Sequence, residues 1–388
     1  MFNTQNEYDT AFKKYTDLLE SAVKGNYVAR AQLKEAISTS DFPAVFTDIT
    51  NAQLLQKYAL DEDIRFWGKI ARRVTVPNFL PQSFMDIGWD DAAFDDLLAT
   101  NGGVKTIPGA LPNVPEHTEY PTAFRLYASE EQLSIRKSGA RIAFTFEAII
   151  NDQWNLVADL PNWLLRTAQQ SEDIEVTTLL ADREGTGLNA EYFNAANGNL
   201  LAYGTNTAGT AALTRDTLKA ALKQANSFKS GPNKNRPVRF QKFALVVPSA
   251  LEETANDIIN LPRQLIITDG SVQYTETFEF GANFEIVVDP WLDVINTTNG
   301  ETAWYVVPFN GDGVRTALGL GFLQNFENPE LRLANETGTY LGGGVVPANQ
   351  GSFLNDDWQL RIRHIFGGVA LNGGIGTVAS TGTAAPTL

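Results

Sequence analysis

Catalytic and metal chemistry in proteins relies mostly on histidine, cysteine and clustered carboxylates, and this sequence supplies few of them. It contains 2 histidines, His117 and His364, and no cysteine. The lack of thiols excludes disulfides, thiol catalysis, iron–sulfur clusters and cysteine-ligated zinc. One isolated imidazole seldom makes a metal site. We expect His364, on the apolar face of a strand, to be a hydrogen-bonded core residue and His117, beside Glu116, to lie on the surface.

The densest acidic cluster is the best sequence candidate for a cation site. It comprises Asp86, Asp90, Asp91, Asp95 and Asp96. A calcium loop alternates oxygen ligands around a glycine at its sharp turn, and residues 92–94 do not provide this, so we favour a solvated helix face. Residues 311–313, Gly-Asp-Gly, resemble a phosphate loop only superficially, and a turn between strands is the better interpretation. The sequence contains no Walker, dinucleotide-binding, GxSxG or HExxH motif.

A carbohydrate-active site would need two carboxylates that meet in space, and sequence spacing can neither show nor exclude such a pair. Five tryptophans could line a sugar cleft, but each lies at a helical or strand period that already predicts a core position: Trp154, Trp163, Trp291, Trp304 and Trp358. We therefore assign no catalytic, cofactor-binding or metal-ligating residue. The sequence predicts a protein that is not an enzyme and has no cofactor.

Composition sets wider limits on the class of protein. The 388 residues are 43% hydrophobic, which is enough to bury cores in about two or three folding units. Lys and Arg total 30 and Asp and Glu total 45, so the net charge of −15 disfavours general binding of nucleic acid. The longest apolar runs, such as 243–247, are too short to span a bilayer, and the first residues do not resemble a signal peptide. We expect a cytoplasm-like compartment.

Hydrophobic periodicity predicts the elements of the N-terminal half. Residues 7–38 are amphipathic and should form a helix followed by a second short one, because apolar residues recur at steps of three and four: Tyr8, Phe12, Tyr15, Leu19 and Val23. A helix is expected at 51–58 and a strand at 70–76. The Gly- and Pro-rich residues 99–121 predict an extended loop. The two-residue period over 124–146 predicts strands.

The strongest helix signal begins near Glu147. One helical face is formed by Ile150, Trp154, Val157, Leu160 and Leu164. Pro161 should kink or restart the helix, since proline removes a backbone donor. Residues 162–183 contain no Gly or Pro and would extend over about 33 Å before Gly185.

The C-terminal half alternates helical and strand patterns. Residues 214–260 read as an α/β unit with a buried strand at 243–247, after which Ser249 and Glu252 predict a capping box. Further strands are expected at 284–288, 304–307 and 315–320. The clearest strand is 358–366, where apolar residues alternate with Gln and Arg. From 372 onward, Gly, Thr, Ala and Ser predict a flexible or weakly held tail.

Four segments, in this order, resemble the major capsid proteins of tailed bacteriophages, which share the Hong Kong 97 fold. Residues 138–152, SGARIAFTFEAIIND, are similar to the family's return from an extended loop into a long helix. Residues 159–161, Asp-Leu-Pro, and residues 166–180 resemble its spine helix. Residues 243–252, FALVVPSALE, resemble a strand and helix of its axial domain, and residues 358–367, WQLRIRHIFG, resemble the closing strand of its peripheral domain.

The resemblance implies an α+β, Hong Kong 97-like fold with an N-terminal arm, an extended loop, a long spine helix, a peripheral domain and an axial domain. The segments it implies are an N-terminal helical segment (1–40), the N-arm (41–100), the extended loop (101–146), the spine helix with the first part of the peripheral domain (147–213), the axial domain (214–330), the closing strands of the peripheral domain (331–371) and a flexible tail (372–388). Residues 1–38 lie outside the resemblance and are either a retained arm or a removable, scaffolding-like segment.

The resemblance also implies a function. The chain would self-assemble through hexamers and pentamers, in the host cytoplasm, into the icosahedral head of a tailed phage that encloses double-stranded DNA without sequence-specific binding. Partners would include portal, scaffolding and decoration proteins. An encapsulin-like compartment, or a β-rich carbohydrate-active or carbohydrate-binding protein, are the alternatives. Some family members crosslink through a lysine near a proline of the extended loop, and residues 119–121 have no lysine.

In that family the extended loop lies across a neighbouring subunit. A basic cluster on its return strand and an acidic cluster on the long helix are therefore candidate contacts between subunits: Arg136, Lys137 and Arg141 against Glu172, Asp173 and Glu175. That both clusters are merely solvated faces is an equally weighted alternative.

Overall fold

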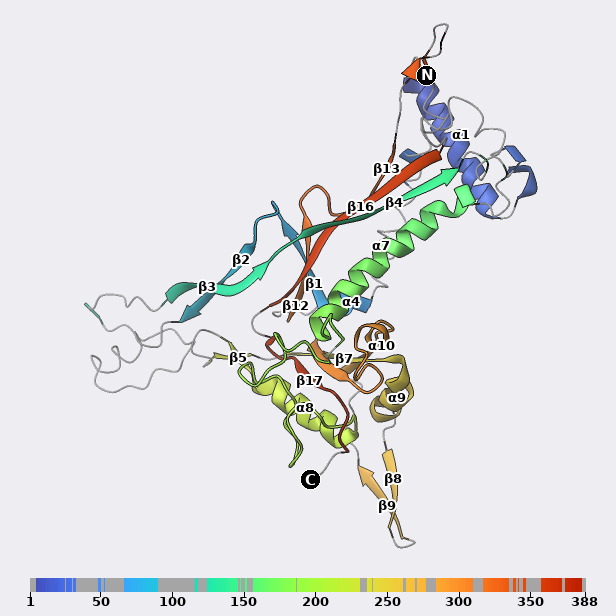
Figure 1. The fold of residues 1–388 in the computed structure, drawn as a ribbon. Coiled ribbons are helices and arrows are strands. Elements are labelled where there is room, and N and C mark those ends of the chain that lie inside the picture. The colour runs from blue at the N-terminus through green and yellow to red at the C-terminus, as the bar shows by residue number, and fades with distance from the viewer. Residues whose placement is uncertain are drawn as a thin grey trace. The chain divides into compact units, whose positions relative to one another are not determined.

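The chain is a mixed α and β protein (Figure 1). The structure is a computed structural model, which describes residues 5–24, 26–29, 31–32, 48–49, 52, 66–89, 116–117, 124–145, 147, 151, 156–185, 187–230, 236–238, 240–260, 263–268, 271–276, 284–309, 317–334, 338–339, 341, 345–346, 357–371 and 374–385. Among these residues no helix is both long enough and apolar enough to cross a lipid bilayer.

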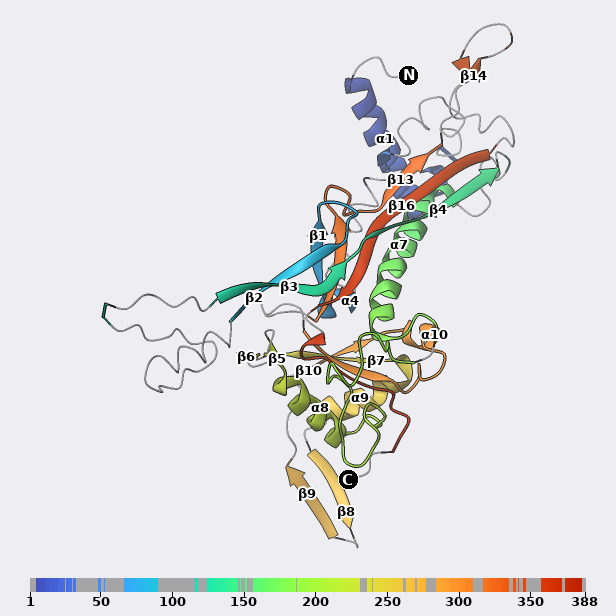
Figure 2. The same ribbon diagram turned by 60° about the vertical axis from the view of Figure 1, so that its left-hand side comes forward.

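Figure 2 shows the same elements from a second direction. The helices are α1 (Gln5–Val23), α4 (Phe66–Ile70), α7 (Leu156–Leu180), α8 (Arg215–Ser227), the 3₁₀ turn η1 (Ser249–Leu251), α9 (Glu252–Asn260) and α10 (Leu292–Ile295). The longer strands are β1 (Ala71–Val76), β2 (Gln82–Trp89), β3 (Phe124–Leu133), β4 (Arg136–Thr145), β7 (Phe243–Val247), β8 (Arg263–Thr268), β9 (Ser271–Glu276), β10 (Phe284–Val288), β11 (Trp304–Pro308), β12 (Leu318–Leu323), β13 (Glu330–Leu333), β16 (Asp357–Ala370) and β17 (Val378–Ser380). Short pairs are β5 (Lys229–Ser230) with β6 (Arg236–Pro237) and β14 (Gly338–Thr339) with β15 (Val345–Val346).

The chain divides into two compact units. Unit 1 comprises Met1–Arg65, Arg136–Glu172 and Phe322–Phe366, and unit 2 comprises Phe66–Ile135, Asp173–Gly321 and Gly367–Leu388. Each unit is therefore assembled from segments far apart in the sequence.

Unit 1 is built on the long antiparallel pair β4–β16, which runs from Asp357 opposite Thr145 to Phe366 opposite Arg136. Strand β13 pairs antiparallel with the other edge of β16. Gly139 is required where β4 meets β16, because a Cβ atom there would lie 2.4 Å from the carbonyl oxygen of Ile362. The segment 136–145, expected to be part of an extended loop, thus forms a sheet with the closing strand.

Helix α1 completes the core of unit 1. Its apolar face places Tyr15, Leu19 and Ala22 among buried residues of the other elements, namely Leu164 and Ala168 of α7, Leu331 of β13, and Leu360 and Ile362 of β16. Leu19 is 1% exposed and Ala22 is fully buried. The predicted helical stripe is confirmed for these N-terminal residues, and they supply core that unit 1 would otherwise lack.

Unit 2 contains a four-stranded sheet in the order β10-β7-β11-β17. Strands β10 and β7 are parallel, and β11 runs antiparallel to both β7 and β17. All five residues of β7 are buried. One face of the sheet packs on α8 and α9 through Leu218, Ala221 and Ile259. On the other face, Phe193 lies 5.6 Å, centroid to centroid, from the ring of Tyr305.

Unit 2 also holds β1, the first four residues of β12, the hairpins β2–β3 and β8–β9, and the last residues of β16. Leu133, at the end of β3, is fully buried. Its side chain packs directly on Gly321, where an added Cβ atom would lie 2.5 Å from Leu133 Cδ2. The turn between β1 and β2 exposes Phe79 and Leu80, while Asn78 Oδ1 accepts the Leu80 N–H at 3.0 Å.

Several predicted elements are confirmed with shifted ends. Strands were expected at 70–76, 284–288 and 304–307, where the structure has β1, β10 and β11. The predicted strand at 315–320 is displaced to 318–323, and the long helix ends at Leu180. Helix α7 is continuous through Pro161 and is not restarted there. The predicted helix at 51–58, the loop glycines 311–313 and most of the acidic cluster lie outside the described residues.

Two expectations are wrong. Ser249 does not cap a helix with Glu252, because Ser249 lies within a 3₁₀ turn that begins after Pro248 and shows no side-chain cap. The capping box is instead at Thr214 and Thr217, at the start of α8. The tail is also not weakly held over residues 374–385, because positive φ angles at Gly374 and Gly376 turn the chain back so that β17 pairs with β11.

Candidate functional site

The predicted basic cluster is exposed on β4. Arg136, Lys137 and Arg141 are all on the surface of unit 1. Lys137 lies opposite Ile365 and Arg141 lies opposite Arg361, whereas Arg136 is opposite Phe366. Since alternate residues of a strand point to opposite faces, Lys137 and Arg141 share one face of the sheet and Arg136 lies on the other.

The shared face has a concentration of positive charge. Exposed Arg361 lies directly opposite Arg141 in the register, and Arg141 donates from Nη1 to Gln359 Oε1 at 3.2 Å. Arg363, one further pair along, is neutralised by Glu330, which also accepts from Arg332 Nε at 2.6 Å. In the described part of unit 1, Lys137, Arg141 and Arg361 thus form one cationic surface.

The predicted acidic cluster has a different environment. Glu172 has 0% exposure, and its Oε1 lies 2.7 Å from Nε2 of His364. Glu175 is 8% exposed and accepts the backbone N–H of Gly368 at 3.3 Å. Arg183 Nη2 lies 3.4 Å from Glu175 Oε2. Asp173 alone is half-buried. Glu172 and Glu175 are therefore buried and hydrogen-bonded within their own chain, which a charge pattern on a helix cannot reveal.

His364 occupies the core position that its strand pattern predicts. It is 4% exposed, and its ring lies 5.8 Å from that of Phe322 and 4.9 Å from that of Phe366. The prediction of a hydrogen-bonded core histidine is confirmed. His117 is exposed, as expected, in a turn with a φ angle of 63°.

Trp304 and Trp163 lie in opposite environments, and Trp291 is half-buried. Trp304 is fully buried and donates from Nε1 to the carbonyl of Ala211 at 3.0 Å. Trp163 is 56% exposed, so the expectation that it belongs to the core is wrong. It lies on the side of α7 that carries Arg166, whereas Leu164 and Leu165 face inward. Helical spacing alone does not decide which side of α7 is covered.

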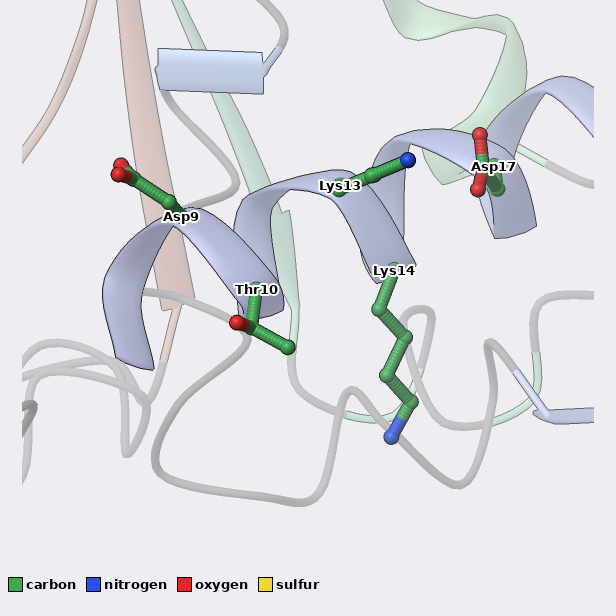
Figure 3. Close-up of a pocket in the computed structure, with 5 residues that line it drawn as sticks. All are labelled: Asp9, Thr10, Lys13, Lys14 and Asp17. Carbon is green, nitrogen blue, oxygen red and sulfur yellow. The ribbon is translucent and has the colours of Figure 1, made fainter. Parts of the chain in front are cut away.

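A pocket of about 500 Å³ lies beside α1 in the described part of the chain. Its described lining is Asp9, Thr10, Lys13, Lys14 and Asp17. Figure 3 shows that these side chains point in different directions and do not converge on one point. Asp9, Lys13 and Asp17 are spaced by four residues, which is the pattern of a solvated, salt-bridge-forming helix face. This arrangement provides no catalytic geometry.

A buried polar site that sequence reasoning missed lies in unit 2. Asp289, immediately after β10, has 0% exposure. Its Oδ2 lies 2.7 Å from Thr177 Oγ1, and its Oδ1 accepts the N–H of Trp291 at 2.9 Å. Burial raises the pKa of this carboxyl to about 6, although the two hydrogen bonds act in the opposite direction. The only local signal was an Asp-Pro-Trp turn directly after a buried strand.

A half-exposed ion cluster joins three other segments of unit 2. Glu285 of β10 lies 2.8 Å from Lys69 of α4 and 2.5 Å from Lys242, which precedes β7. Hydrogen bonds from Lys242 and Lys69 lower the pKa of Glu285. Lys242 also lies 4.6 Å from the ring centroid of Phe309. The cluster fixes α4 against β10 and is structural.

The described residues contain no group of three or more histidine, aspartate or glutamate side chains that could hold a metal ion. What they provide instead is a mixed fold with a cationic strand surface and buried polar contacts that link helices to strands.

The chain belongs to the phage capsid protein family, whose model matches residues 129–378. It is thus a structural capsid protein and not an enzyme, as predicted, and its place is the capsid of a virion. The resemblance to capsid proteins that the four sequence segments indicated is confirmed. Capsid proteins act by associating with copies of themselves, and this chain is a shell protein of that kind.

Solved phage structures are similar to the chain at low identity. One from Microbacterium phage Oxtober96 has 11% identity and a TM-score of 0.44, with 80% of this chain and 88% of that chain covered. The satellite phage P4 procapsid with size determination (Sid) protein gives 9% identity, a TM-score of 0.43, and coverage of 87% and 100%. The capsid structure of cyanophage P-SCSP1u has 13% identity and a TM-score of 0.42, with 83% of this chain and 88% of that chain covered. No curated protein matches the sequence.

Proposed function

We propose that the chain is the major capsid protein of a tailed phage, with a Hong Kong 97-like fold, and that it forms hexamers and pentamers in an icosahedral head around double-stranded DNA. The observation that carries the proposal is the family match over residues 129–378, which includes α7, β4, β7, β10, β11 and β16. The seven segments predicted from the sequence belong to this proposal. Assembly takes place in the host cytoplasm.

The charge of the chain supports a container for DNA. A net charge of −15 keeps the inner wall from binding a polyanion tightly, while the cationic surface of Lys137, Arg141 and Arg361 is small and local. Portal, scaffolding and decoration proteins are the further partners that this role requires. An encapsulin-like shell around protein cargo is the second candidate, because the same kind of subunit would serve it.

The test is expression of the full chain, followed by size-exclusion chromatography and electron microscopy. Closed particles of uniform diameter are expected, and a stable, compact monomer under all conditions would contradict the proposal. Nuclease-protected DNA in particles from infected cells would distinguish a phage head from a compartment that encloses protein.

We also propose that the basic residues of β4 meet carboxylates of a neighbouring subunit. Arg136, Lys137 and Arg141 are exposed, and Asp173 is half-buried, whereas Glu172 and Glu175 are buried. An exposed pair contributes only about 0.2 to 1 kcal/mol, but repetition at every interface makes such pairs effective in setting register and rate.

This contact is tested by charge reversal. Lys137→Glu with Arg141→Glu should slow assembly, measured by light scattering, without changing the circular dichroism of the subunit. Adding Asp173→Lys should restore part of the rate. Arg166→Glu, at another exposed position, is the matched control for a general charge effect. If the triple variant assembles no faster than the double variant, Asp173 is not the partner.

A further inference from the structure

The buried carboxyl of Asp289 lies at a junction of three elements of unit 2. It follows β10, it contacts Thr177 of α7 through Oδ2, and it accepts the backbone N–H of Trp291, at the start of α10, through Oδ1. Asp289 and Thr177 both have 0% exposure. Since water does not reach the carboxyl, its hydrogen bonds must come from the protein.

When Asp289 is ionised, two oxygen–oxygen contacts share the single hydroxyl proton of Thr177. Thr177 Oγ1 has a single proton and lies within bonding distance of two acceptors, the carbonyl oxygen of Asp173 at 3.0 Å and Oδ2 of Asp289 at 2.7 Å. An ionised Asp289 is only an acceptor, so Thr177 can satisfy one of the two oxygens. With a proton on Oδ2, Asp289 donates to Thr177 Oγ1 and Thr177 donates to Asp173, and every contact is satisfied.

The groups around Asp289 favour this added proton. Thr177 and the Asp173 carbonyl face it from α7, and Trp291 N–H faces it from the start of α10. The nearby charge on α10 is that of Asp293, which raises the pKa of Asp289 further. Tyr305 of β11 is neutral, because burial and then the charge of Asp289 raise the pKa of its hydroxyl. No cation is among the groups that act on this carboxyl in the described residues.

We propose that Asp289 is a proton-binding site that locks the C-terminal part of α7 to the end of β10. Uptake of the proton completes a relay from Asp289 through Thr177 to the Asp173 carbonyl. Loss of the proton leaves a charge buried at a position with 0% exposure, so this junction loosens. The site goes beyond the shell function and is a property of the single chain.

The sign of the pH effect follows from the carboxyl's raised pKa. The folded value is about 6, above the value of about 3.8 for an unperturbed aspartate. Unfolding therefore releases a proton between these values, and the folded state is favoured increasingly as pH falls from about 7 toward 4. The difference between the two pKa values corresponds to about a hundredfold change in the folding equilibrium of unit 2.

The decisive variant is Asp289→Asn, which copies the protonated form. Its amide can donate to Thr177 Oγ1 while its oxygen accepts from Trp291. Amide hydrogen exchange of Trp291 and of the end of α7, measured by mass spectrometry on unassembled full-length subunits, should be slower in the variant than in the wild type at about pH 8, by up to a hundredfold. The two proteins should exchange alike at about pH 5, and comparison at equal pH removes the intrinsic pH dependence of exchange.

A second variant and a control separate protonation from general stability. Thr177→Val removes the hydroxyl that also stabilises the ionised form, so the pH at which protection changes should move upward. Asp257→Asn, at an exposed position of α9, should behave as the wild type. If Asp289→Asn has the same pH profile as the wild type, or if Thr177→Val leaves the midpoint unchanged, Asp289 is not a proton-binding lock.

Discussion

The buried pair of Glu172 and His364 gives the sharpest test of how unit 1 is held together. It joins α7 to β16 through the 2.7 Å contact between Oε1 and Nε2. Both side chains are almost completely buried, with exposures of 0% for Glu172 and 5% for His364. We consider the change His364→Phe, which keeps an aromatic ring beside Phe322 and Phe366 and removes the polar contact.

The expected loss follows from the burial of Glu172. Removing one partner of a buried, hydrogen-bonded pair costs about 3–5 kcal/mol, because the remaining charge stays desolvated. Since phenylalanine preserves most of the packing, we expect His364→Phe to lower the free energy of unfolding by about 3 kcal/mol, at the low end of that range. Glu172→Gln retains a neutral hydrogen bond with His364 and should cost about 1–2 kcal/mol.

The double variant Glu172→Leu with His364→Phe is the informative one. Replacing both members of a buried polar pair by apolar residues of similar volume is often neutral or stabilising. The double variant should therefore regain most of the stability that His364→Phe loses. Urea unfolding of unassembled subunits, followed by circular dichroism, measures the differences, with exposed Glu191→Gln as a control that should change stability by less than about 0.5 kcal/mol.

Two results would refute this reasoning. A loss below about 1 kcal/mol for His364→Phe would mean that Glu172 finds water or another donor and that the pair does not hold α7 to β16. A double variant that is less stable than both single variants would mean that the pair itself, and not the isolated charge, stabilises unit 1.

Three further predictions concern other contacts. Leu19→Ala should lower the free energy of unfolding by about 2–5 kcal/mol, because Leu19 of α1 is 1% exposed in the unit 1 core. Glu20→Ala, at an exposed position, is the control and should change this free energy little. If the two variants had comparable urea midpoints, α1 would not be part of the core. Gly139→Ala should separate β4 from β16 and prevent particle assembly in electron micrographs, since its Cβ would meet a backbone carbonyl at 2.4 Å, and normal particles would disprove this. Glu285→Gln should lower stability by at most about 1 kcal/mol near neutral pH, because the cluster with Lys69 and Lys242 is half-exposed. The lowered pKa of Glu285 means that this stabilisation is present above its unfolded value and is lost as pH falls, so wild type and variant should converge in acid.

The periodicity of apolar residues was sufficient to predict which side chains are buried in β16 and β7. The alternation along 358–366 correctly placed Leu360, Ile362 and His364 on the buried face of β16, because successive strand residues point to opposite sides. The continuous apolar run at 243–247 correctly predicted a fully buried strand. The four ordered segments led to the capsid family, since they lie in elements whose local patterns are strong.

Tertiary structure decided every feature that depends on a partner far away in the sequence. Glu172 and Glu175 read as an exposed charge cluster, yet β16 brings His364 and the Gly368 N–H against them. The Gly- and Thr-rich C-terminal segment carries little hydrophobic signal, but β11 provides an edge that β17 completes through backbone hydrogen bonds, which are independent of side-chain type.

The sequence by itself therefore determined the class of the chain: its strands and long helices, its lack of thiol chemistry, and its kinship with shell proteins. It could not determine which side of a helix is covered, as Trp163 demonstrates with an exposure of 56%. Nor could it place Asp289 beside Thr177, 112 residues away along the chain. The physical reason is that periodicity records the spacing of side chains along one element, whereas burial and protonation are set by the groups that other elements bring to it.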